Sequence, residues 1–192
     1  MTIAPRARAQ RLSTRSYLLC AALGAIQAMT IIFLTPVNAA AASFAPPLYA
    51  LLSALSIVFI NLAARLLPSP VSALLTAALT CLMVVPFSSL GFLIAVPLLS
   101  QGAAIALILW LTRHRSAWRY LVAGGVAGIV AFFVALPVFS TDDLTPAVLV
   151  TTLAARIAAG VGSALLAGAL AKALRAAGIG PRSPRSVASS DK

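Results

Sequence analysis

The chain has 192 residues, of which 61% are hydrophobic and only 9% are charged. This balance excludes an ordinary soluble domain, because one core cannot hide so much apolar surface. The net charge of +11 points to a lipid bilayer rather than to nucleic acid. Almost all of the basic residues lie in the tails and in short gaps between apolar runs, where they would face lipid headgroups.

Apolar stretches long enough to cross a hydrocarbon layer recur along the chain. The sequence therefore predicts an all-α integral protein of the cell membrane, with six transmembrane helices and both termini in the cytoplasm. We expect a basic N-terminal tail (residues 1–16), a membrane domain (residues 17–178) and a disordered C-terminal tail (residues 179–192). The six apolar segments are residues 17–34, 44–67, 71–85, 90–111, 118–139 and 146–173.

Three of these segments have unusual ends or lengths. The first follows an arginine-rich flank but lacks a convincing signal-peptide cleavage region, so we expect a retained helix. The third is shorter than the ~20 residues that a perpendicular helix needs, and it is either a short span or a re-entrant element. The last is longer than the bilayer requires, so it should tilt or continue into the cytosol and end near Gly178.

The positions of the charges predict the topology. Apart from Arg156, the bases fall into four groups, and the gaps between these groups carry none, which places the groups inside and the gaps outside. The basic groups are Arg6, Arg8, Arg11 and Arg15; Arg65; Arg113, Arg115 and Arg119; and residues 172–192. The outer gaps are residues 35–38, 87–89 and 140–143, the last with Asp142 and Asp143.

Arg156 is the one strong base inside an apolar run, ~15 Å from the outer end of the last segment at helical rise and so close to the midplane. A charge there costs several kcal/mol unless it faces a polar cavity or a partner, which makes Arg156 a candidate substrate-binding residue. The alternative is a structural arginine bonded to helix-end carbonyls. Gln27, Asn61 and Gln101 either converge with Arg156 or make ordinary interhelical hydrogen bonds worth ~0.6 kcal/mol each.

Small residues recur at four-residue spacing in the first and last helices, where they would let helices approach closely in lipid. In the first helix this face is a candidate docking site for another membrane subunit, and the alternative is packing within the chain. Its members are Ala21, Ala25, Gly24 and Ala28. The last helix carries the same spacing at Gly160, Ala164 and Gly168.

The sequence carries no motif of a known catalytic type. It contains no Walker lysine motif, no GxSxG, no HExxH and no carboxylate pair in the apolar runs. Cys20 and Cys81 lie far apart, and His114 lies between two arginines, so no metal-ligand set is formed. We expect a protein that is not an enzyme and that uses no metal or cofactor.

The size, the six predicted spans and the alanine-rich first helix resemble the substrate-binding (S) components of energy-coupling factor (ECF) vitamin transporters. The final helix, with RIAAG at residues 156–160, LLAG at 165–168 and LAK at 170–172, is similar to the closing helix of the subgroup linked to thiamine or its precursors. The resemblance implies a high-affinity binder of a small molecule that works with a separate transmembrane coupling subunit and a pair of cytoplasmic ATPases.

The leading hypothesis is therefore an uptake component for a vitamin or a vitamin precursor. A cationic thiazolium would favour a carboxylate or an aromatic cage. Because the apolar segments contain no acidic residue, Arg156 favours a ligand with a carboxylate, phosphate or carbonyl group. The alternative is a non-transporting membrane scaffold or assembly protein. A self-sufficient carrier is disfavoured, since acidic relay residues and internal repeats are both missing from the sequence.

Overall fold

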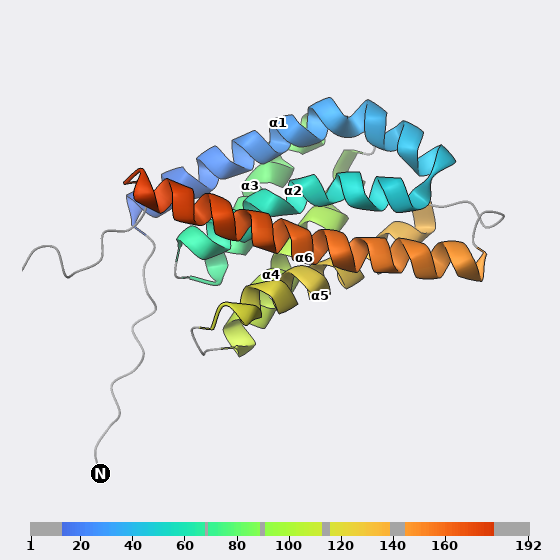
Figure 1. Cartoon of the computed structure of the whole chain (residues 1–192). Coiled ribbons are helices and arrows are strands. Elements are labelled where there is room, and N and C mark those ends of the chain that lie inside the picture. The colour runs from blue at the N-terminus through green and yellow to red at the C-terminus, as the bar shows by residue number, and fades with distance from the viewer. Residues whose placement is uncertain (1–12, 68, 89–90, 113–115, 139–144, 179–192) are drawn as a thin grey trace, which may run out of the picture.

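The computed structural model describes residues 13–67, 69–88, 91–112, 116–138 and 145–178. Within these ranges all regular structure is helical, as predicted, and six α-helices follow one another along the chain (Figure 1). They are α1 (Thr14–Phe44), α2 (Pro46–Leu66), α3 (Val71–Val84), α4 (Ala95–Leu111), α5 (Trp118–Ala135) and α6 (Pro146–Ala176). Short 3₁₀ turns extend three of them: η1 (Val85–Phe87), η2 (Gly91–Ile94) and η3 (Leu136–Val138).

Five of the described helical stretches are long and apolar enough to cross a membrane: Thr14–Phe44, Pro46–Leu66, Gly91–Leu111, Trp118–Ala135 and Pro146–Ala176. Large apolar side chains such as Phe33, Leu82 and Phe92 stand exposed on the outside of the bundle, where a bilayer would cover them. The chain is thus an all-helical, multi-pass membrane protein. The remaining apolar helix, Val71–Phe87, is shorter, and its full crossing of the bilayer stays a prediction.

Neighbouring helices form a closed ring in the order α1, α2, α6, α5, α4, α3, and α2 also contacts α3, α4 and α5 across it. Hydrogen bonds between helices fix their directions. The thiol of Cys20 lies 3.8 Å from the carbonyl oxygen of Ser72, and the Thr80 hydroxyl donates to the carbonyl oxygen of Gly24 at 3.3 Å, so α1 and α3 are parallel.

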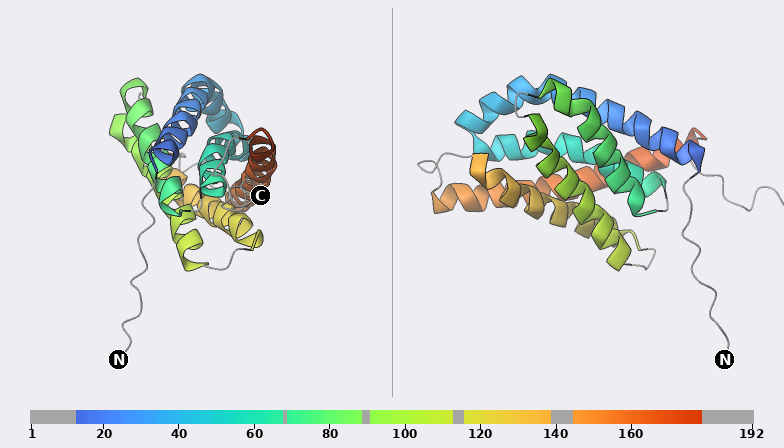
Figure 2. Two further views of the ribbon diagram at one scale, coloured as in Figure 1. Left: turned by 90° about the vertical axis from the view of Figure 1, so that its left-hand side faces the viewer. Right: turned by 180° about the vertical axis from the view of Figure 1, so that it is seen from behind.

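The α2 and α6 helices are also parallel, because Arg156 contacts Ser53 and Asn61 contacts Ser163. Since α1 and α2 form a hairpin, the start of α1 and the end of α6 lie at the same end of the bundle (Figures 1 and 2). This end also carries the end of α2 and the start of α5. We call it the basic end, because Arg65, Arg119 and Arg175 lie there together with Arg15 at the start of α1.

One predicted turn is wrong. Residues 35–38, expected as an outer gap, lie inside α1, and the chain reverses at Ala45, immediately before Pro46 and Pro47 open α2. Pro36 and Asn38 favour turns in water, but a proline inside an apolar helix is tolerated when nearby groups adjust. The Thr35 hydroxyl donates to the carbonyl oxygen of Ile31 at 2.7 Å, and α1 bends along its length (Figure 1), as a proline within a helix causes.

The ends of α6 follow the sequence signals. The Thr145 hydroxyl accepts the N–H of Val148 at 3.4 Å, and Pro146 occupies the first turn. Beyond Ala176, Gly178 has a φ of 79°, the left-handed conformation that commonly ends a helix. Several predictions concern residues outside the described ranges: the N-terminal arginines Arg6, Arg8 and Arg11, the loop with Arg113, His114 and Arg115, the outer loop at 140–143, and the tail at 179–192.

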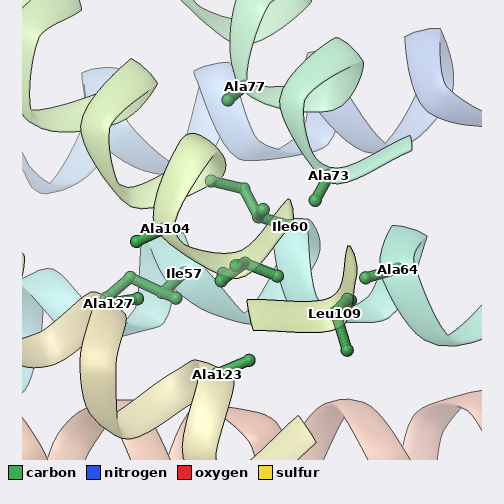
Figure 3. Packing of buried hydrophobic residues seen from close by; sticks show 10 residues of the cluster. Ile57, Ile60, Ala64, Ala73, Ala77, Ala104, Leu109, Ala123 and Ala127 are labelled. Atoms are coloured by element: carbon green, nitrogen blue, oxygen red, sulfur yellow. The ribbon is translucent and has the colours of Figure 1, made fainter. Parts of the chain in front are cut away.

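The core is built mainly from alanine. Figure 3 shows Ile57 and Ile60 of α2 surrounded by alanines that α3, α4 and α5 contribute, with Leu109 closing one side. Small side chains let the helix backbones come close, which supplies van der Waals contact where lipid gives no hydrophobic drive between helices. The labelled alanines are Ala64, Ala73, Ala77, Ala104, Ala123 and Ala127.

The closest backbone approach joins α5 to α6. A Cβ on Gly124 or on Gly160 would overlap the carbonyl oxygen of the other residue, and a Cβ on Gly128 would overlap the carbonyl oxygen of Arg156. Gly124 and Gly128 form the small-xxx-small spacing of close membrane crossings. This crossing holds the turn of α6 that contains Arg156 against α5.

Candidate ligand-binding site

Arg156 projects from α6 onto the first turns of α2. Its side chain is only 4% exposed, its Nη1 donates to the hydroxyl of Ser53, and its guanidinium carbon lies 5.0 Å from the centre of the Tyr49 ring. Tyr49 and Ser53 are four positions apart in α2 and therefore share one face of that helix. A hydroxyl and an aromatic face together hold the guanidinium at one place.

The charge of Arg156 has no acidic counterpart in the ranges that the structure describes, because Asp142, Asp143 and Asp191 all lie outside them. The Nε of Arg156 is buried without a hydrogen-bond partner, and so is the hydroxyl of Thr152 one turn earlier on α6. Each such atom costs ~1–3 kcal/mol, and an uncompensated buried charge costs more. Carboxylate, phosphate and carbonyl oxygens are the acceptors that such donors bind.

The position of Arg156 along the bundle follows from its distance to the arginines at the basic end. From Arg156 to Arg175, α6 rises by about 28 Å, and from Tyr49 to Arg65, α2 rises by about 24 Å. If Arg65 and Arg175 mark one boundary of a hydrocarbon layer ~30 Å thick, Arg156 lies near the opposite boundary; its place near the midplane stays a prediction. The α6 helix has 31 residues, about 46 Å at helical rise, and is longer than such a layer.

Sequence reasoning did not single out Tyr49, Ser53 or Thr152. Tyr49 with Ser53, and Thr152 with Arg156, are polar pairs at four-residue spacing inside apolar helices, a signal that could have indicated one polar face on each. On α1, the Oδ1 of Asn38 is buried without a partner. Asn38 lies at about the height of Ser53, because α1 and α2 reverse at Ala45.

The other predicted polar residues occupy different interfaces. The Asn61 side-chain amide donates to the Ser163 hydroxyl at 3.1 Å, about two turns closer to the basic end than Arg156. Gln27 is fully buried where α1 faces α3, and neither atom of its amide has a hydrogen-bond partner. Gln101 is buried in α4, next to the contact of Gly102 with α3, and its Oε1 is also unpartnered. No contact in the described chain joins Gln27, Asn61 or Gln101 to Arg156.

The small-residue face of α1 divides into two parts. Gly24 and Ala28 are buried, and a Cβ on Gly24 would lie 3.3 Å from the carbonyl oxygen of Thr76, so this half packs α1 on α3. Ala21 and Ala25 are half-buried and remain the members that a second subunit could reach. In α6, Gly160 and Ala164 pack on α5, while Gly168 makes room for the guanidinium of Arg65.

An apolar groove of about 180 Å³ runs between α2 and α6. It begins about one turn from Arg156 and continues past Ser163 towards the basic end. Gly162 stands in it with open space beside its Cα. The lining residues are Leu51, Ala54, Leu55, Val58, Ala159, Gly162, Ser163 and Leu166.

In the part of the chain that the structure describes, no group of three His, Cys, Asp or Glu side chains comes together. Cys20 and Cys81 are both buried and unpaired with each other. Comparison of the chain with protein-family models, with curated proteins and with solved structures finds no match. A functional assignment therefore depends on the chemistry of these residues and on the arrangement of the helices.

Proposed function

We propose that the chain is the membrane-embedded substrate-binding component of an ECF-type importer, and that Arg156 binds an acidic or carbonyl group of a vitamin or vitamin precursor. One observation carries the proposal. The guanidinium of Arg156 is held by Ser53 and by the Tyr49 ring, yet its Nε is buried without a partner and no acidic residue of the described chain balances its charge.

The arrangement of the helices supports this proposal. Six consecutive helices with both ends on one side are what the resemblance to S components implies, and the basic end would face the cytoplasm under the positive-inside rule. The Arg156 site is then close to the outer surface, within reach of a ligand that arrives from outside. The energy for uptake would come from separate ATPase subunits through a transmembrane coupling subunit.

Purification from the native membrane in mild detergent tests the proposal. We expect a large transmembrane subunit and a pair of ATPases to co-purify, together with a small molecule that carries a carboxylate, phosphate or carbonyl group and is identified by mass spectrometry after extraction. Repeated purification without any ATPase would contradict the importer assignment. If those same preparations retained a small molecule, the chain would be a ligand-binding protein that is not part of an importer.

The contacts of Ser53 and Tyr49 also favour a second candidate, a non-transporting membrane scaffold in which Arg156 is structural. Both contacts are made within the chain, so they stabilise the guanidinium without any ligand. The two candidates differ in what removal of the charge does. A scaffold loses stability when Arg156 is replaced by an apolar residue, whereas a binding component loses ligand affinity and keeps its fold.

A further inference from the structure

Three arginines from three helices converge at the basic end, far from Arg156. Arg65 ends α2, Arg119 lies in the first turn of α5 and Arg175 lies in the last turn of α6. The guanidinium carbons of Arg65 and Arg119 lie 4.5 Å and 5.0 Å from the centre of the same Tyr120 ring. The third arginine contacts the backbone of the first, because Arg175 Nη2 donates to the carbonyl oxygen of Arg65.

The fold makes room for this convergence. Gly168 of α6 faces Arg65, and a Cβ at this position would lie 2.9 Å from Arg65 Nη1 and 3.1 Å from its guanidinium carbon. On the other side, Arg119 Nη1 donates to the carbonyl oxygen of Thr112 at 3.1 Å, which fixes it beside the end of α4. The guanidinium groups of Arg65 and Arg119 are therefore each held against the backbone of a neighbouring helix or helix end.

The arginines gather without any acidic residue from the described ranges, which contain no Asp or Glu. Three like charges in one place repel one another, and an anion between them would relieve this repulsion. The Nε of Arg65 is in addition buried without a hydrogen-bond partner. Planar guanidinium groups match the tetrahedral oxygens of a phosphate, which can accept from several forks at once.

We propose that Arg65, Arg119 and Arg175 form a binding site for a phosphate group, supplied by the headgroup of an anionic lipid. Trp110 and Trp118 stand about half exposed at the same end, and indole rings at a helix end mark the headgroup layer. Burial decreases from the half-buried Arg65 and Arg119 to the exposed Arg175, so the site opens towards that layer. Basic pockets between helices at this depth are known sites for phospholipid headgroups. The site is independent of any ligand at Arg156.

Native mass spectrometry and thermal unfolding of the full-length protein in detergent test this site with phosphatidylglycerol, phosphatidylcholine and inorganic phosphate as probes. We expect phosphatidylglycerol to bind and to raise the unfolding temperature, and phosphatidylcholine to do so much less. Removing one arginine by Arg65→Gln or Arg175→Gln should weaken phosphatidylglycerol binding about fivefold, and removing both roughly 25-fold.

Arg15→Gln is the matched control, because Arg15 is an exposed arginine at the same end but outside the cluster; its binding should match wild type. Arg175→Gln changes an exposed side chain and keeps the test valid if Arg65→Gln does not fold. If inorganic phosphate alone stabilises the protein and displaces phosphatidylglycerol, the site takes phosphate from solution. The proposal would be overturned if the two lipids had equal effects, or if the double variant bound phosphatidylglycerol as the wild type does. It would also be overturned if an acidic protein segment bound the site while phosphatidylglycerol and inorganic phosphate did not.

Discussion

Arg156 and Asn61 represent two ways in which the α2–α6 interface accommodates a polar side chain. Asn61 finds a hydroxyl, that of Ser163, which in turn donates to the carbonyl oxygen of Gly160 at 2.7 Å. Arg156 finds a hydroxyl and a ring but keeps an unpartnered donor and an uncompensated charge. The Oδ1 of Asn61 is also buried without a hydrogen-bond partner, but Asn61 is neutral, whereas Arg156 carries a charge that no acidic residue of the described ranges balances.

For Asn61, a double-mutant cycle should give a small coupling energy. Asn61→Leu and Ser163→Ala, singly and together, should couple by about 0.6 kcal/mol in reversible unfolding experiments in detergent or bicelles. Ligand affinity should remain that of the wild type in all three variants. A coupling above about 2 kcal/mol, or loss of ligand binding in the single variants, would show that Asn61 belongs to the binding site after all.

At the scale of helices, glycine and alanine decide which elements touch. The α5–α6 crossing depends on Gly124, Gly128 and Gly160, where each missing Cβ is occupied by backbone of the partner helix. The α1–α3 contact is less tight, since a Cβ on Gly24 would lie 3.3 Å from the carbonyl oxygen of Thr76. Because lipid solvates apolar side chains well, this close packing is the main source of helix association.

The crossing predicts a contrast between two glycines of α6. Gly160→Ala should destabilise the protein by at least about 1–3 kcal/mol, because the added methyl group has no space against α5. Gly162→Ala, two positions away, faces open space and should leave stability unchanged or raise it by up to about 1 kcal/mol through helix propensity. Thermal unfolding of both variants measures this difference; equal effects would contradict the packing described for α6.

The α1 face predicts a second contrast. Ala21→Leu with Ala25→Leu should leave a folded monomer that no longer retains its coupling subunit during purification, because both positions are only half-buried. Gly24→Leu should instead impair folding of the monomer itself, since its Cβ already meets α3 at 3.3 Å. Size-exclusion profiles and co-purified partners distinguish the two results. Misfolding of the Ala21 and Ala25 variant would assign the whole face to internal packing.

The helices themselves could be predicted well because each apolar run is long and its ends carry clear signals, such as Thr145 before Pro146 and Gly178 after α6. Hydropathy did not predict how α1 ends, since Pro36 and Asn38 favour a turn in water but are tolerated inside a membrane helix. The Gly124 and Gly128 spacing was present in the sequence and identifies the α5 crossing, although nothing local indicates that its partner is Gly160.

At the scale of the whole molecule, the bundle has two unlike ends. One carries arginines around Tyr120 and exposed tryptophans, and the other carries a single buried arginine next to α2. The contacts of Arg156 could not be predicted, because Ser53 is 103 positions away in the chain and only the folded ring brings α2 beside α6. The sequence did provide the residue type and the lack of acids, which is why the preferred ligand chemistry is unchanged.

Cysteine labelling in intact cells should confirm the orientation of these ends. After Cys20 and Cys81 are replaced by alanine, Ser116→Cys at the basic end should react only with membrane-permeant reagents, and Ala147→Cys at the other end should react with impermeant ones. Both side chains are exposed, so neither is hidden by packing within the bundle. The reverse labelling pattern would invert the topology and remove the outer position of Arg156.

The most direct measurement is the affinity and thermal stability of Arg156→Lys and Arg156→Met with the small molecule extracted from the wild-type protein. The lysine variant should fold and bind about tenfold more weakly, because it keeps the charge but loses the planar fork. The methionine variant should lose binding and unfold at the same or a higher temperature, since a buried charge is removed. Arg15→Met, which removes an exposed arginine, should change neither property. Wild-type affinity in the methionine variant, or unfolding of both Arg156 variants without ligand, would contradict the account.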